Sequence, residues 1–242
     1  MRILMELRAN NDQTIDHMIY HKLQGFVYGT LISSTPFKNL HDSSSYKFFS
    51  YSNIFPPMPL VKSGDHRYLL LGSPNHEFIK SVSRTVKAII ECGKTVNIGD
   101  QTYTLVSARL IKHRINSTKC VIQTSTPIMG RIPEKSYSQF QIPVQYRKAK
   151  FLYWRRYLPA DILIKLIEDN MRRKYESFYN IKIDYKINDT FHMIEEFTFI
   201  KEVIVHLPIG YSTLKVPTSF WKFHCDTSGP EQRRILHFIL DR

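Results

Sequence analysis

The fold of this chain is narrowed most by the order in which its periodic segments follow one another. Between residues 2 and 110, short stretches in which every second residue is apolar alternate with two longer stretches in which apolar residues recur every three to four positions. The first pattern is typical of half-buried strands, and the second is typical of amphipathic helices. The segments therefore predict the order strand, helix, strand, strand, helix, strand within about 115 residues.

Turn and capping signals indicate where these elements begin and end. A polar ANNDQ turn follows the first strand, Ser33–Pro36 ends the first helix, and Ser73-Pro74 supplies an N-cap and a first-turn proline for the second helix. A Gly99-Asp100 turn makes the last strand pattern a hairpin. The expected strands are residues 2–8, 48–54, 67–71, 95–98 and 103–110, and the expected helices are residues 14–33 and the segment that Gly93 closes.

The second part of the chain starts the same order again. Its expected strands are residues 119–126, 181–187, 197–206 and 213–224, and its expected helices are residues 159–178 and a last one that begins at Gly229-Pro230. The predicted fold class is α+β, with tandem ferredoxin-like units of the βαββαβ kind. We expect one domain at residues 1–115 and a second at residues 116–242 that lacks its final strand, since the sequence stops at Arg242.

The chain carries a large positive charge. It has 34 Lys and Arg against 21 Asp and Glu, which gives a formal net charge of +13. Solubility alone needs much less net charge, and an excess of this size is unfavourable by self-repulsion unless an anion neutralises it. Nucleic acid is therefore the leading class of partner.

The cysteines and the apolar runs indicate the cellular compartment in which the protein is expected. Cys92, Cys120 and Cys225 lie far apart and form no CxxC pair, which argues against a disulfide framework and a structural zinc site. The N-terminal segment has charges inside its apolar part, and no apolar run approaches the roughly 18 residues of a membrane span. These features predict a cytoplasmic protein with no membrane association, no bound metal and no cofactor.

Three residues of types that move protons or bind phosphate lie in the stretch from residue 17 to residue 51. Tyr28 falls on the polar face of the first helix, His41 lies in the loop after it, and Lys47 precedes the next strand. Each alone is most often a packing residue or a solvated side chain. Together they carry more weight, because chemistry at a phosphate needs several such groups at once.

The sequence around these residues resembles a known family. MRILMEL, the helix segment LQGFVYGTLISSTP, the Leu40-His41 pair and KFFSYS from Lys47 follow one another at spacings similar to those of the CRISPR repeat-processing endoribonucleases. That family belongs to the repeat-associated RNA-binding superfamily of tandem ferredoxin-like proteins. Each segment alone is a weak signal, whereas their combination over residues 1–54 is specific. Beyond residue 54 the resemblance is carried mainly by the order of elements.

The resemblance implies a function and a site. A member of this family cleaves precursor CRISPR RNA within its repeats without a metal ion, leaving a 2′,3′-cyclic phosphate and a 5′-hydroxyl. Carried over by position, Tyr28, His41 and Lys47 match its catalytic tyrosine, histidine and lysine. The implied partner is CRISPR repeat RNA, and membership of a CRISPR effector ribonucleoprotein and a homodimer both stay open. His17 and His21 are reserve candidates on the Tyr28 face, and no third zinc ligand stands out beside them.

The chemistry of these residue types fits the implied roles. Attack by a ribose 2′-OH on its own phosphodiester needs a base, an acid for the leaving 5′-oxygen and positive charge beside the phosphorane. Imidazole exchanges protons near neutral pH, and a lysine ammonium is a point charge for a non-bridging oxygen. A phenol, with an ordinary pKa of about 10, is a poor base and a good donor. We expect His41 to transfer protons, Tyr28 to act at the 2′-OH and Lys47 to stabilise charge; which of His41 and Tyr28 is the base stays open.

A basic and aromatic segment predicts the RNA contacts. Lys and Arg outnumber acidic residues from residue 147 to residue 174, and aromatic residues are interleaved with them. Basic side chains neutralise phosphates and aromatic faces stack on unpaired bases, although a solvated helix face beside core aromatics would look alike. The predicted RNA-binding residues are Arg147, Lys148, Lys150, Tyr153, Trp154, Arg155 and Arg156, with Lys215 and Lys222 on the late strand as a second contact surface.

Two features leave alternatives open. The family commonly has a glycine-rich loop after its last helix, whereas here RILHFILDR resembles only the lead-in and no GxG occurs. Either the chain as given stops short of that loop, or the protein is a divergent member. A non-catalytic RNA-binding subunit of a CRISPR ribonucleoprotein fits the same pattern. A generic RNA-recognition protein is disfavoured, because no strand carries the [K/R]-G-[F/Y]-[G/A]-F signature.

Overall fold

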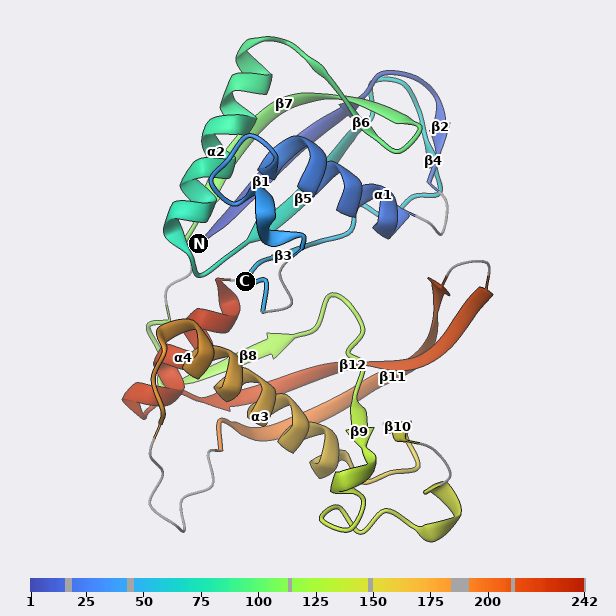
Figure 1. Cartoon of the computed structure of the whole chain (residues 1–242), viewed down its shortest axis with the longest axis vertical. Coiled ribbons are helices and arrows are strands. Elements are labelled where there is room, and N and C mark those ends of the chain that lie inside the picture. The colour runs from blue at the N-terminus through green and yellow to red at the C-terminus, as the bar shows by residue number, and fades with distance from the viewer. Residues whose placement is uncertain are drawn as a thin grey trace. The chain divides into compact units, whose positions relative to one another are not determined.

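The chain forms two compact units in the computed structural model (Figure 1), which describes residues 1–15, 19–42, 46–112, 115–147, 150–183, 192–209 and 212–241. It is a mixed α/β protein, as the order of the periodic segments predicted. One unit comprises Met1–Arg114 and His237–Arg242, and the other comprises Ile115–Leu236. The chain's last residues therefore group with the first unit, whereas the sequence predicted them in the second domain. None of the described helices is long and apolar enough to cross a membrane.

The first unit is built on a five-stranded antiparallel sheet in the order β3-β5-β1-β7-β6. The strands are β1 (Arg2–Ala9), β3 (Ser50–Tyr51), β5 (His66–Gly72), β6 (Thr95–Ile98) and β7 (Gln101–Ile111), and a separate ladder pairs β2 (Gln13–Thr14) with β4 (Leu60–Val61). Alternation along the central strand β1 buries Ile3, Met5 and Leu7 on one face, as the period of two predicted.

Helical segments complete the core of this unit. α1 (Ile19–Phe26) continues into the π-helical segment η1 (Val27–Ile32), and α2 (His76–Glu91) follows β5. Figure 1 shows α1 and α2 against the sheet. Their apolar faces join the sheet in one buried cluster, which includes Leu23, Phe26, Leu31, Leu69, Phe78, Ile79, Val82, Val96 and Tyr103. The helical period in the sequence thus matches the faces that are buried.

The first helix begins later than the sequence predicted. Thr14 ends β2, and its carbonyl oxygen accepts a hydrogen bond from the side-chain amide of Gln101 at 2.5 Å. The backbone N–H of Ile15 donates to the carbonyl oxygen of Pro59 at 2.8 Å. Because Thr14 belongs to a strand paired with β4, the helix does not begin there, and its described part starts at Ile19.

The connection between β3 and α2 also differs from the prediction. Asn75 caps α2, since its side-chain oxygen accepts a hydrogen bond from the N–H of Phe78 at 3.1 Å. The hydroxyl of Ser73, predicted as the cap, donates instead to the carbonyl oxygen of Phe48 at 2.7 Å. The predicted strand at residues 48–54 is reduced to β3, and at its start Phe48 has a positive φ of 44°, which is not extended.

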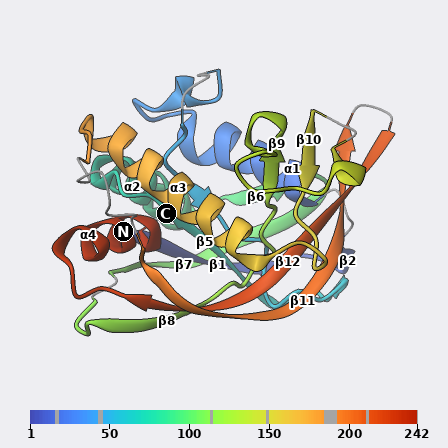
Figure 2. The same ribbon diagram turned by 90° about the horizontal axis from the view of Figure 1, so that it is seen from below.

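The second unit is built on a three-stranded antiparallel sheet in the order β11-β12-β8. The elements of this part of the chain are β8 (Lys119–Gln123), β9 (Arg131–Pro133), β10 (Phe151–Tyr153), α3 (Ala160–Tyr179), β11 (Ile194–Ile209), β12 (Ser212–Asp226) and α4 (Pro230–Leu240). Figure 2 shows α3 across one face of this sheet, with β11 and β12 as a long curved ribbon. The β9–β10 ladder was not predicted. Of the strand predicted at residues 181–187, residues 181–183 are not in a strand and the rest lie outside the described residues.

Helix α3 carries an unexpected buried carboxylate in addition to the predicted apolar residues Ile162 and Leu163. Glu168 is only 4% exposed, and burial raises its pKa above the ordinary value of 4.5. Its Oε1 accepts hydrogen bonds from the backbone N–H groups of Met193 at 2.8 Å and Ile194 at 2.9 Å. Since these groups lie at the start of β11, Glu168 ties the helix to the sheet.

Candidate functional site

Tyr28 is held by η1, the π-helical continuation of α1. Turns of this kind are rare and often occur at functional sites. The phenol packs half-buried against the core, and this burial raises its pKa above the ordinary value of 10.0. Tyr28 is therefore neutral at physiological pH and suited to donating a hydrogen bond.

His41 lies directly beside Tyr28. The two rings meet edge to face, with centroids 4.8 Å apart and an interplanar angle of 90°. His41 follows the short 3₁₀ turn η2 (Lys38–Leu40), its Nδ1 lies 3.2 Å from Oδ1 of Asp42, and its side chain is 57% exposed. The contact with Tyr28 restrains the imidazole while its exposure leaves it open to a substrate.

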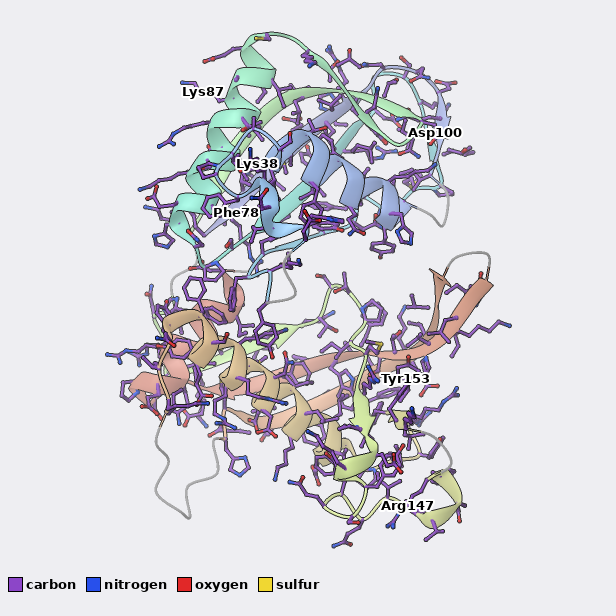
Figure 3. All side chains as sticks on the ribbon, in the orientation of Figure 1. Lys38, Phe78, Lys87, Asp100, Arg147 and Tyr153 are labelled. Carbon is purple, nitrogen blue, oxygen red and sulfur yellow. The ribbon has the colours of Figure 1, made fainter. Side chains whose placement is uncertain are left out.

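The loop that carries His41 is anchored to the core at its start. The hydroxyl of Thr35 donates to the carbonyl oxygen of Ile32 at 2.7 Å and accepts from the N–H of Phe37 at 3.2 Å. The ring of Phe37 then meets Phe78, labelled in Figure 3, at a centroid distance of 5.3 Å. The SSTP segment, predicted to stop the helix, thereby also fixes the direction in which the chain leaves it.

Lys47 fastens the other end of this loop. Its Nζ donates to the carbonyl oxygens of Leu40 and His41, the latter at 2.9 Å. Such carbonyls at the end of a helical turn lack a partner within the turn. The structure therefore brings the three predicted catalytic residues together, since the Tyr28 ring contacts the His41 ring and the Lys47 ammonium contacts the His41 backbone.

The backbone after Lys47 is strained and held in place. Phe48 has a φ of 44°, a conformation that costs a non-glycine residue of order 1 kcal/mol or more and occurs preferentially at functional sites. Its carbonyl oxygen accepts the hydrogen bond from Ser73, which is 1% exposed. The position from which Lys47 projects is therefore set by a buried contact.

Tyr51 is a neighbour that the sequence did not single out. It lies on β3 opposite the buried Leu71 and packs against the same core as Tyr28. Burial raises the pKa of Tyr51, and the charge of an ionised Tyr28 would raise it further. Two neutral phenols therefore border the site. The sequence could have indicated Tyr51 through its spacing from Phe49, because residues two apart in a strand lie on the same face.

The donor set of this site is a phenol, an imidazole and an ammonium. It is suited to proton transfer and to stabilising negative charge. Within the part of the chain that the structure describes, no group of three or more His, Cys, Asp or Glu could hold a metal ion. The reserve candidate His21 is exposed on α1, and His17 lies outside the described residues.

The predicted RNA-binding residues of the basic segment lie in the second unit. Arg147 is exposed, and its Nε donates to the carbonyl oxygen of Ile142 at 2.6 Å. Tyr153 is half-buried on β10, and Figure 3 labels both Arg147 and Tyr153. Lys150 is exposed, and Lys148 lies outside the described residues. Arg147 and Lys150 thus have the exposure that a phosphate contact needs.

Arg155 and Arg156 lie beside β11. Nη1 of Arg155 is 3.9 Å from Oε1 of Glu202, and the backbone N–H of Arg156 donates to the same carboxylate at 3.1 Å. The Arg156 guanidinium stands 5.5 Å from the centre of the Phe199 ring. Glu202 therefore pairs with the guanidinium of Arg155 and the backbone of Arg156, whereas the Arg156 guanidinium lies over the Phe199 ring.

The late-strand lysines differ in their surroundings. Lys215 is exposed on β12, where it pairs with His206 of β11. Lys222 is half-buried on β12, between Thr198 of β11 and Gln123 of β8. Both are placed on the sheet as the predicted strand implied.

Trp154 requires a correction. Its side chain is 4% exposed, its ring packs against Trp221 at 5.3 Å, and its Nε1 donates to the carbonyl oxygen of Pro159 at 3.0 Å. A ring enclosed in this way has no free face for a nucleobase. The prediction of an RNA contact was wrong because aromatic residues beside basic ones also occur where a chain enters its core.

Curated proteins similar to this chain share one name. The chain is 25% identical over 244 residues to the CRISPR-associated endoribonuclease Cas6 of Haloferax mediterranei, covering 100% of this chain and 87% of the relative. It is 26% identical over 180 residues to the CRISPR-associated endoribonuclease Cas6 2 of Methanocaldococcus jannaschii, covering 74% of this chain and 66% of the relative. No family model matches the chain. The relatives confirm the resemblance seen in residues 1–54.

Two solved structures have folds similar to that of this chain. A CRISPR-associated protein Cas6 superposes with a TM-score of 0.63 at 20% identity, covering 97% of this chain and 90% of the other. A RAMP protein described as binding different RNA substrates superposes with a TM-score of 0.61 at 16% identity, with the same two coverages. At these identities the likeness concerns the fold.

Proposed function

We propose that this chain, a homologue of the CRISPR-associated endoribonucleases named Cas6, cleaves precursor CRISPR RNA within its repeats. The observation that carries the proposal is the contact of Tyr28 and Lys47 with His41, through the ring and the backbone respectively. The net charge of +13 supports a polyanionic substrate. An RNA substrate of this kind also favours the cytoplasm as the place of action.

The proposed reaction is an internal transesterification that needs no metal ion. The ribose 2′-oxygen forms a bond to the phosphorus while the bond from phosphorus to the 5′-oxygen breaks. The proton of the 2′-OH passes to a base and an acid donates a proton to the 5′-oxygen, so the products are a 2′,3′-cyclic phosphate and a 5′-hydroxyl. The raised pKa of Tyr28 favours a donor over a base at this position, which assigns the base to His41.

Lys47 has two roles in this proposal. It stabilises the charge on the non-bridging oxygens, and it positions the His41 loop through the backbone carbonyls of Leu40 and His41. The exposed basic residues Arg147, Lys150, Arg156 and Lys215 neutralise phosphates of the bound RNA.

We also propose that both units are variants of the ferredoxin-like fold. In the first unit the order β3-β5-β1-β7, with α1 and α2 in the connections, supports a βαββαβ unit extended by β6 at its edge. In the second unit the order β11-β12-β8, with α3 between β8 and β11, supports the same arrangement with three strands.

The proposal is tested by incubating a CRISPR repeat RNA with the protein in EDTA. We expect cleavage that yields a cyclic phosphate and that a 2′-deoxy substitution at the cut position abolishes. Substituting His41→Ala should leave binding intact and lower the cleavage rate by about 100-fold or more. Binding of the repeat without any product would instead favour a non-catalytic RNA-binding subunit.

A further inference from the structure

A pocket in the second unit is lined by none of the individual residues predicted to contact RNA, although Tyr157 and Lys165 belong to the same basic segment from residue 147 to residue 174. It has a volume of about 410 Å³ and is lined by residues 139–143, residues 157–159, Asp161, Ile162 and Lys165. This volume falls within the range of about 300–1,000 Å³ typical of small-molecule sites. Its floor includes the buried side chains of Ile142 and Ile162, whereas Tyr157, Asp161 and Lys165 are exposed.

The walls of this pocket are fixed by hydrogen bonds. On one side Gln141, at a φ of 50°, donates its N–H to Ser138 at 3.1 Å, and Ile142 donates to Tyr137 at 2.9 Å. The carbonyl oxygen of Ile142 is held by Arg147. On the other side the carbonyl oxygen of Pro159 is held by the buried Trp154. The pocket is therefore preformed, which lowers the entropic cost of filling it.

An aromatic platform stands at its rim. Tyr157 is 53% exposed, and its ring stacks on Tyr146 with centroids 4.8 Å apart and an interplanar angle of 28°. Tyr146 covers one face of the Tyr157 ring. The exposed surface of Tyr157 remains for stacking with a further flat ring. Stacking of a base on such a side chain contributes about 1–3 kcal/mol and is insensitive to base identity.

The polar groups around the platform match a nucleotide. The side-chain amides of Gln139 and Gln141 and the carboxylate of Asp161 offer both donors and acceptors for the edge of a base. Lys165 lines the pocket, and Arg147 donates a hydrogen bond to the carbonyl oxygen of Ile142, another lining residue. These two side chains place positive charge near the pocket for a phosphate.

We infer that this pocket binds one unpaired nucleotide of single-stranded RNA, with the base stacked on Tyr157 and its edge read by Gln139, Gln141 and Asp161. The inference rests on the RNA substrate of the proposed function and adds a site that recognises a base outside the catalytic residues. Lys165 contacts the phosphate of that nucleotide.

Binding is measured with a single-stranded RNA of about 12 nucleotides in which 2-aminopurine replaces one base at successive positions. The full chain carries His41→Ala so that no RNA is cut. We expect fluorescence quenching at one position. Substituting Tyr157→Ala should abolish that quenching and weaken binding by about tenfold, the equivalent of one lost stack. Tyr157→Phe should behave as the parent, and Asp161→Asn should change which base is preferred there.

Tyr179→Ala is the matched control, because Tyr179 is 50% exposed and lies at the far end of α3 from Asp161. The inference is overturned if no position is quenched, or if Tyr157→Ala binds the RNA and quenches its fluorescence as the parent does. It is also overturned if Tyr157→Phe or Tyr179→Ala weakens binding and quenching as much as Tyr157→Ala. The cleavage assay with His41 intact is separate. Absence of cleavage with position-specific quenching retained would contradict the proposed reaction alone, and cleavage without such quenching would contradict the pocket alone.

Discussion

Tyr28 and His41 touch because η1 ends at Ile32, the chain turns at Thr35, and it returns through Phe37, whose ring packs against Phe78. The contact is made by the two rings and does not use the Tyr28 hydroxyl. The packing role and the chemical role of Tyr28 can therefore be tested separately.

Substituting Tyr28→Phe keeps the ring contacts with His41 and Phe49 and removes only the hydroxyl. We expect single-turnover cleavage to slow by about 100-fold, as for other losses of a positioned proton donor, while the dissociation constant for the RNA stays unchanged. Because burial raises the pKa of Tyr28, the phenol is protonated throughout the neutral range, and the pH at which the rate changes should not shift.

Tyr51→Phe is the control for this substitution. It removes a hydroxyl from the neighbouring phenol on β3, which also packs against the core. An equal loss of rate in both variants would argue against a specific role for Tyr28.

Lys47 is proposed to position the His41 loop and to stabilise charge on the phosphate. Two substitutions test these roles separately. Lys47→Met removes the donors to Leu40 and His41, so amide hydrogen exchange in residues 38–42 should accelerate and cleavage should fall by about 100-fold or more. Lys47→Arg should restore slow exchange but only part of the rate, because the planar guanidinium differs in geometry from an ammonium. Unchanged exchange in Lys47→Met would refute the positioning role.

Between elements, Ser73 connects the end of β5 to the strained backbone at Phe48. Substituting Ser73→Ala leaves a carbonyl without this donor, and we expect a loss of about 1–2 kcal/mol in the free energy of unfolding. Cleavage should also decrease, because Lys47 precedes Phe48. Denaturant unfolding and the cleavage assay measure the two effects. Ser50→Ala, at an exposed position of β3, should change stability by less than about 0.5 kcal/mol.

Glu168 links α3 to the start of β11 and makes this connection dependent on pH. Burial raises its pKa in the folded chain above the ordinary value of 4.5, so folding favours the protonated carboxyl. The corresponding stability is fully present below pH 4.5 and is lost as the pH rises through the folded pKa.

Glu168→Gln tests this dependence, because glutamine is neutral and retains an oxygen for Met193 and Ile194. We expect the parent to lose stability relative to Glu168→Gln as the pH rises above 4.5, measured by urea unfolding across a pH series. A constant difference between the two proteins would contradict the raised pKa.

For the whole molecule, the charge of +13 predicts RNA binding that weakens steeply with salt. Substituting Arg156→Ala should weaken binding and reduce the slope of log K against log salt by about one unit if the residue contacts a phosphate. Lys87→Ala on α2, labelled in Figure 3, removes an equal charge from a side chain that is 76% exposed and should leave the slope unchanged. An equal reduction of the slope in Arg156→Ala and Lys87→Ala would indicate an effect of net charge and not a phosphate contact of Arg156.

The parts of the fold that the sequence predicted correctly are those set by neighbouring residues. The period of two along β1 and the period of 3.6 along α2 depend on residues a few positions apart, and each of these elements buries the face that its period marks. Along α3 the apolar Ile162 and Leu163 are buried as predicted, but Glu168 and Glu176 are buried as well. Tyr28, His41 and Lys47 could be picked out because they belong to one short segment with recognisable spacing.

The features that the sequence missed depend on partners far along the chain. Trp154 is buried by Trp221, and Glu168 is buried because Met193 and Ile194 supply its donors. The hydroxyl of Ser73 looked like a helix cap and is used by Phe48 instead. In each case the local pattern permits two environments, and a contact formed only in the folded chain selects between them.

The amino-acid order alone thus sufficed for the mixed α/β character of the fold, for the buried faces of β1 and α2, and for the choice of three candidate catalytic residues, because hydrophobic periodicity and motif spacing are local. The contact between the rings of Tyr28 and His41, the attachment of Lys47 to the His41 backbone and the pocket beside Tyr157 arose only on folding. Their geometry depends on packing and hydrogen bonds between segments that no periodic pattern relates.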